Sequence, residues 1–109
     1  MDTQQTLELY KSTKKFLDDL NEALLTKVYS AIHKAENELN THFYGLRDWL
    51  RAPFGSKITG IDAIETIKTL ANSDKETVTF YEHVFMRPAN KHTYMTSDIK
   101  IIAKYLDED

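Results

Sequence analysis

The first 44 residues contain no glycine and no proline, and no other feature constrains the fold of this chain as strongly. Apolar residues recur through this stretch, and just beyond it, at steps that place them on one face of an α-helix. They are Leu7, Tyr10, Leu17, Leu20, Leu24, Val28, Ile32, Ala35, Leu39, Phe43, Leu46 and Leu50. Asp2 or Thr3 can cap the start, because a short oxygen-bearing side chain there accepts a hydrogen bond from an unpaired helix N–H.

One straight helix over residues 7–50 would be too long for a compact domain of this size. It would measure roughly 65 Å, whereas such a domain has a radius of gyration of about 13 Å. Either the helix breaks, at 18–21 or at Asn40-Thr41, or a second copy of the chain covers the part that projects. We expect a long helix that ends near Asn40, followed by a shorter one over 41–51.

The remainder of the chain also favours helices. The whole chain has three glycines and two prolines, which are too few for the many turns of an all-β domain. Pro53 and Gly55 mark a loop at 52–57, and a helix over 98–106 follows a cap at Thr96 or Ser97. Between them a further helical stripe consists of Ile61, Ile64, Ile67 and Leu70. We therefore expect one domain over 1–109, mainly α, built as a small helical bundle with a long N-terminal helix.

The segment 77–95 permits two interpretations. Ser73 and Glu76 have the spacing of a capping box, which favours a helix from about residue 77. The same segment is rich in β-branched and aromatic residues with a period of two, and residues 87–90 could turn it back on itself. We weigh the helix above the hairpin, because the capping box is a local and specific signal. The alternative is an α+β fold with a β-hairpin at about 77–95.

Composition argues against several classes of function. The chain has no cysteine, which excludes disulfides, thiol catalysis and cysteine-ligated zinc. Its formal net charge of −3 gives no basic excess for general duplex binding. The apolar runs fall far short of the ~20 residues that span a bilayer, and the N-terminus does not resemble a signal peptide. We expect a cytoplasmic protein that does not act on membranes.

Catalytic, metal and cofactor motifs are weak. His33 and Glu36 lie three residues apart and could share one helix face, but di-metal helical bundles need paired motifs. The stretch 55–60 lacks the lysine position of a phosphate-binding loop. No serine stands in a Gly-x-Ser-x-Gly elbow. We expect neither an enzyme nor a metal or cofactor site.

The stretch 42–54 is the strongest candidate for a binding surface. It holds the only tryptophan together with tyrosine and arginine, the residue types that dominate interface hot spots. Phe43, Leu46 and Leu50 continue the apolar stripe and belong to the core in this interpretation. A second aromatic and basic stretch, 80–94, contributes one arginine. The predicted partner-binding residues are Tyr44, Arg47, Trp49, Arg51, Phe54 and Arg87.

In size, helicity and lack of cysteine the chain resembles small bacterial or phage proteins that bind and inhibit one partner, such as immunity or anti-defence proteins. This resemblance concerns overall character, and no motif residue carries it. Our leading hypothesis is a non-enzymatic protein-interaction module of inhibitor, immunity, anti-defence or adaptor type, which binds one partner protein and forms a homodimer. The alternative is a nucleic-acid-binding module, whose phosphate contacts would be Arg47, Arg51, Lys57, Arg87 and Lys91.

Overall fold

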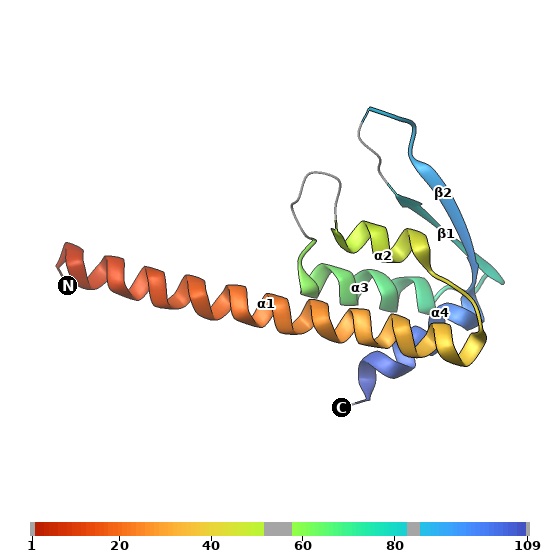
Figure 1. The fold of residues 1–109 in the computed structure, drawn as a ribbon, viewed down its shortest axis with the longest axis horizontal. Helices are drawn as coiled ribbons and strands as arrows, with labels where there is room; N and C mark the ends of the chain where they lie inside the picture. The colour runs from red at the N-terminus through yellow and green to blue at the C-terminus, as the bar shows by residue number, and fades with distance from the viewer. Residues whose placement is uncertain (1, 52–57, 83–85, 109) are drawn as a thin grey trace.

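The computed structural model describes residues 2–51, 58–82 and 86–108. Within these ranges the chain forms four helices and a two-stranded antiparallel sheet (Figure 1). The order is α1 (Thr3–Leu39), α2 (Tyr44–Arg51), α3 (Gly60–Ala71), β1 (Thr77–Glu82), β2 (Asn90–Met95) and α4 (Thr96–Asp107). The fold is mainly α with one hairpin. The loop expected at 52–57 lies outside the described residues.

Helix α1 runs without interruption past 18–21 and ends at Asn40, which confirms the favoured break. Asp2 and Gln5 form a capping box at its start, where the Asp2 side chain accepts from the Gln5 N–H at 2.8 Å. At its end Asn40 adopts the left-handed conformation, with φ of 52°. The second helix begins at Tyr44 rather than Thr41, so the expected start was three residues too early.

The helix favoured after residue 77 was wrong, and the hairpin alternative is confirmed. Strands β1 and β2 pair from Thr77↔Met95 to Glu82↔Asn90. Val78 and Phe80 on alternate positions of β1 are buried. The Ser73 hydroxyl accepts from the Lys75 N–H, two residues on, so it stabilises a turn instead of a helix start. Tertiary burial of one strand face outweighs the local capping signal here.

Helix α4 begins without the expected side-chain cap. Met95 occupies the cap position, and the Thr96 hydroxyl instead donates to the Lys75 carbonyl at 2.6 Å. The Thr96 N–H donates to the Glu76 carbonyl at 2.8 Å. Thr96 therefore ties the start of α4 to the turn before β1, and capping by Thr96 or Ser97 was an incorrect expectation.

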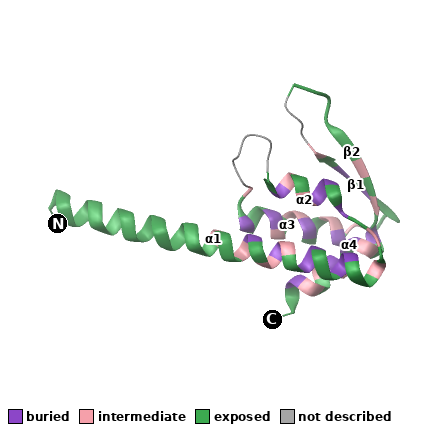
Figure 2. Ribbon diagram, in the orientation of Figure 1, coloured by how far each residue is buried: buried purple, intermediate pink, exposed green. Residues whose placement is uncertain are grey.

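The core lies where α3 and α4 pack against the C-terminal half of α1, with α2 and the hairpin beside them (Figure 1). Its most completely buried large side chains are Phe43, Ile32, Leu46, Leu50, Ile67, Ile99, Ile102 and Val28. The apolar stripe of α1 was expected to be longer than one small body can cover. Burial begins only at Leu25, and the described residues before Asn21 are all exposed (Figure 2).

Residues 2–20 of α1, here called the overhang, project from the folded body as an unaccompanied helix (Figure 1). The radius of gyration is 16.9 Å and the principal extents are 57 × 38 × 24 Å. A compact domain of this length would have a radius of about 13 Å. Among the described residues, no helix is both long enough and apolar enough to cross a membrane.

Candidate functional site

The residues predicted to bind a partner lie in different surroundings in the structure. Tyr44 is exposed and stacks on His42 with ring centroids 5.0 Å apart. Arg51 is exposed at the end of α2. Trp49 is half-buried and packs edge-on against Phe80 of β1 at 5.0 Å, so it stabilises the contact between α2 and the hairpin.

Of the three remaining predicted residues, Arg47 is paired with Glu36. Arg87 is exposed beside the hairpin turn, and Phe54 lies outside the described residues. Among the described members, Tyr44, Arg47 and Arg51 share one face of α2, whereas Trp49 packs on the hairpin and Arg87 lies beside its turn.

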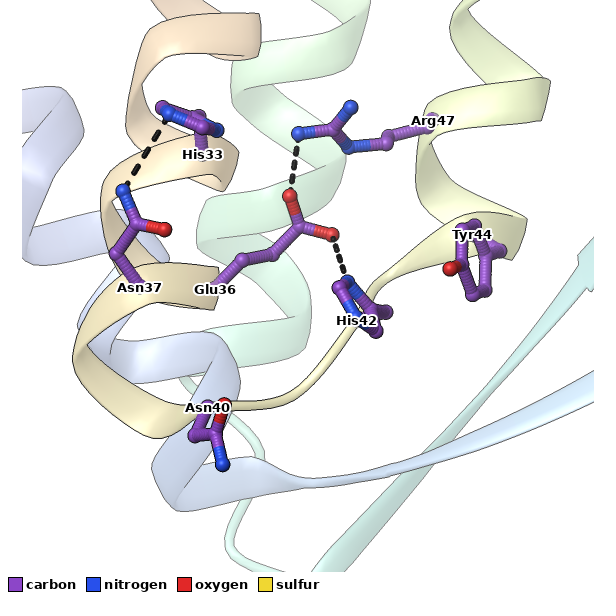
Figure 3. Close-up of a pocket in the computed structure, with 7 residues that line it drawn as sticks. All are labelled: His33, Glu36, Asn37, Asn40, His42, Tyr44 and Arg47. Atoms are coloured by element: carbon purple, nitrogen blue, oxygen red, sulfur yellow. Dashed lines mark hydrogen bonds and ion pairs between the residues drawn. The ribbon is translucent and has the colours of Figure 1, made fainter.

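A polar pocket of about 390 Å³ lies at the corner between α1 and α2 (Figure 3). Glu36 stands at its centre, with its side chain only 6% exposed. Arg47 Nη2 donates to Glu36 Oε1, and the Phe43 N–H donates to Oε2 at 3.0 Å. His42 Nδ1 lies 3.6 Å from the same Oε2. Both carboxylate oxygens are thus occupied by groups that fix the chain direction between the two helices.

The weak metal candidate also lies in this pocket. His33 contacts Asn37 through its Nε2 at 3.3 Å, and Glu36 is held by Arg47 (Figure 3). Across the part of the chain that the structure describes, no three His, Asp or Glu side chains are grouped to hold a metal ion. Two pairs, Glu36–Arg47 and His33–Asn37, therefore form part of the pocket lining, while the buried Arg47 Nε has no hydrogen-bond partner among the described residues.

The second aromatic stretch packs the hairpin onto α2. His92 Nε2 lies 2.9 Å from Glu82 Oε2. The ring centroids of Tyr94 and Phe43 are 5.3 Å apart. Burial raises the pKa of the Tyr94 hydroxyl, although backbone N–H groups of α2 oppose that rise. A β-carbon on Gly45 would stand 2.3 Å from the His92 ring, so only glycine permits this approach. The rings of His92 and Tyr94 are therefore engaged within the fold, whereas Tyr81 of β1 is exposed.

The five cations of the nucleic-acid alternative are also dispersed. Arg47 is paired with Glu36, and Arg51 lies at the end of α2. Arg87 and Lys91 are exposed in and beside the turn of the hairpin, and Lys57 lies outside the described residues. A stripe of basic side chains, which phosphate binding requires, is not assembled by the described members of this set.

The overhang carries the largest exposed apolar surface that the described residues form on one element. Six large side chains are between 42% and 66% exposed, namely Leu7, Leu9, Tyr10, Phe16, Leu17 and Leu20. At 100° per residue they occupy about half of the helix circumference. The other half is polar and carries the Lys15–Asp19 ion pair, while the Lys14–Asp18 pair lies along its edge. An amphipathic helix of this kind has an unpartnered face.

The sequence contained the signal for this surface. The stripe of apolar residues continues well past the length of helix that one small body can cover, as the mismatch in length indicated. Most of the predicted partner-binding residues, however, lie on α2, because aromatic and arginine residues are concentrated there. None of them belongs to the overhang.

A groove of about 290 Å³, here called the junction groove, lies where the overhang meets α3. It is lined by Leu17, Asp18, Leu20, Asn21, Leu24, Thr59 and Ile61. The Gly60 N–H donates to Asn21 Oδ1, and a β-carbon on Gly60 would stand 2.4 Å from Leu24 Cβ. Helix α3 therefore begins in close contact with α1 at this point. Ile61 on its first turn remains 57% exposed and extends the apolar surface of the overhang.

Comparisons of this chain with protein-family models, with curated proteins and with solved structures gave no match.

Proposed function

We propose that this protein is a non-enzymatic protein-interaction module whose binding surface is the apolar face of the overhang. The observation that supports this proposal is the exposure of six large apolar side chains on one side of the overhang, which meets the rest of the described chain only where α3 begins. Contiguous exposed apolar surface on a folded chain marks a site of protein or membrane contact far more often than scattered apolar residues do.

The energy available from this face is large enough for binding. Burial of a leucine or phenylalanine side chain contributes about 1.5–3 kcal/mol, and these six are close to half exposed. The helix is already formed and capped at Asp2, so a partner would not have to fold it. A preformed helix that lays its apolar side against a partner is a recurrent mode of protein recognition.

Such a module acts by occluding or bridging its partner, as inhibitor, immunity, anti-defence and adaptor proteins do. That action requires a binding face and no catalytic group. The body formed by the rest of the chain would hold the helix in place and keep its apolar face available. The cytoplasmic location expected from the sequence belongs to the same proposal.

The test is affinity capture with a tagged chain that is co-expressed with an untagged copy of itself in the native host. Leu17→Glu places a charge in the middle of the apolar face. Ser12→Glu adds the same charge about 140° around the same exposed helix and serves as the matched control. We expect wild type and Ser12→Glu to retain a protein, either the untagged copy or another chain, that Leu17→Glu loses.

The α2 surface is tested in the same experiment with Arg51→Glu. Loss of the captured protein in Arg51→Glu, with full retention in Leu17→Glu, would move the binding surface back to α2 and contradict the proposal. If the wild-type chain retains neither its untagged copy nor another protein, the evidence for an interaction module is removed altogether.

A further inference from the structure

We infer that the occupant of the overhang is a second copy of this chain, whose α1 pairs with it in the antiparallel direction. This inference rests on the proposed function and names the partner at that same surface. Three features carry it: the spacing of the apolar residues, the charges that flank them, and the position at which α3 meets α1.

Four of the six apolar residues of the overhang are spaced symmetrically about residues 13 and 14. Tyr10 and Leu7 stand on the N-terminal side, and Leu17 and Leu20 stand at similar distances on the C-terminal side. If two such helices cross about residue 14 in opposite directions, Tyr10 of each copy faces the stretch between Leu17 and Leu20 of the other. Apolar side chains of one copy then contact apolar side chains of the other at both ends of the pair, as helix pairing requires.

The charged edge of the overhang favours the same direction. Lys11 and Asp18 lie on one edge of the apolar face, where Lys14 Nζ is 2.9 Å from Asp18 Oδ2. In an antiparallel pair identical edges face each other, so Lys11 of each copy lies opposite Asp18 of the other and two equivalent ion pairs can form. In a parallel pair that edge would instead face the opposite edge, which is formed by Leu9, Phe16 and Leu20 and carries no charge for Lys11 or Asp18 to pair with.

The position of α3 excludes the parallel arrangement on steric grounds. The apolar face of the overhang continues through Leu24 into Val28, which is fully buried in the body. A parallel second helix would run on along this face past Asn21 into the space where Gly60 already contacts α1. An antiparallel second helix extends past this point by only about one turn, because its residue 7 lies opposite residue 21 and it starts at Thr3.

The junction groove then has a defined occupant. The first turns of the second copy, with Leu7 and Tyr10, lie against the groove walls formed by Leu20, Leu24 and Ile61. Six side chains about half exposed offer roughly 500–700 Å² per copy, and the groove adds to this. The sum approaches the ~1,200 Å² in total at which stable interfaces begin. Two folded bodies would stand at opposite ends of the paired helices.

Sedimentation equilibrium of the purified full-length chain up to ~100 µM tests the inference. We expect a dimer in wild type and in Ser12→Glu, and a dissociation constant at least about 100-fold weaker in Leu17→Glu, because one buried hot-spot side chain is replaced by a charge. Circular dichroism checks that the Leu17→Glu variant retains its helices. We expect it to, because the Leu17 side chain is exposed within a single copy of the chain.

Single cysteines test the direction, since the chain has none of its own. Thr13→Cys lies beside the crossing point and should be joined to its counterpart by a short bifunctional thiol reagent. Thr6→Cys lies on the same face, but in an antiparallel pair its counterpart is ~24 Å away, so it should not be joined. Efficient joining of Thr6→Cys would show a parallel pair and overturn the inference.

The outcomes separate this inference from the proposed function. The inference that a second copy occupies the overhang is overturned if the chain is a monomer at every concentration. It is also overturned if the Leu17→Glu variant still forms the dimer. If affinity capture still retains a different protein that Leu17→Glu loses, the interaction module stands and only the identity of its partner is wrong. If the purified chain is monomeric and capture retains nothing, both fail.

Discussion

Arg47 of α2 donates through Nη2 to Glu36 Oε1 near the end of α1, and this ion pair fixes the corner between the two helices. The Glu36 side chain is 6% exposed and that of Arg47 is 30% exposed. The second carboxylate oxygen accepts from the Phe43 N–H. Arg47 was predicted to bind a partner, but its guanidinium group already serves the fold.

Arg47→Ala should destabilise the protein by about 2–4 kcal/mol, because it leaves the buried Glu36 carboxylate without its main partner. Arg51→Ala, at an exposed position one turn further along α2, should change stability by no more than about 0.5 kcal/mol. Urea denaturation of both variants measures the difference. Equal, small effects would mean that the ion pair contributes little to the corner.

Gly45→Ala should lower stability by about 1–3 kcal/mol, since the new methyl group would overlap the His92 ring, which Glu82 holds in place. The hairpin would have to move away from α2. His92→Ala removes the obstacle, so the double variant should cost less than the sum of the two single ones. A double-mutant cycle by chemical denaturation measures this coupling. Strict additivity would contradict the proposed overlap.

Asn40→Gly should stabilise the protein by roughly 0.5–1 kcal/mol, because Asn40 ends α1 in the left-handed conformation with φ of 52°. Asn40→Ala should destabilise it by about 1 kcal/mol, since alanine tolerates that conformation less well than asparagine. The midpoint of urea denaturation gives both values. Should alanine prove as stable as glycine here, the left-handed cap would not matter for stability.

Tyr94 gives the protein a dependence on alkaline pH. Burial raises the pKa of its hydroxyl above the ordinary value of 10.0, so the folded state prefers the neutral form. This contribution to stability is complete below pH 10 and is lost as the pH rises through the folded-state pKa. Tyr94→Phe should therefore reduce the fall in melting temperature above pH 10, whereas Tyr81→Phe, at an exposed position of β1, should not. Identical pH profiles for the two variants would contradict this origin.

The predictions from sequence succeeded where the signal was local and periodic. The long helix and its end near Asn40 follow from the spacing of apolar residues and the absence of glycine and proline. The hairpin was not preferred, because the Ser73–Glu76 spacing is a strong local signal for a helix. Burial of Val78 and Phe80 against the body decides the outcome, and that contact joins residues far apart in the chain.

The candidate sites were harder to predict for the same reason. Residue types on α2 suggested a hot spot, but Arg47 and Trp49 are engaged within the fold by Glu36 and Phe80, which sequence spacing does not reveal. The length of the apolar stripe of α1 showed that one body cannot cover all of it, but its spacing does not show which part is covered. Only the position of α3, whose first residue meets Asn21, determines where covered helix ends and the overhang begins.

Removal of residues 2–18 should leave the folded body intact, because every one of these positions is exposed and burial begins only at Leu25. Asp19 would then cap the shortened helix. A dimer held by the overhang gains stability by mass action, so the melting temperature of the full chain should rise with protein concentration, whereas that of the shortened chain should not. Differential scanning calorimetry at concentrations tenfold apart makes the comparison. A shortened chain that fails to fold would mean that the overhang supports the body directly, and its exposed apolar face would then need a different explanation.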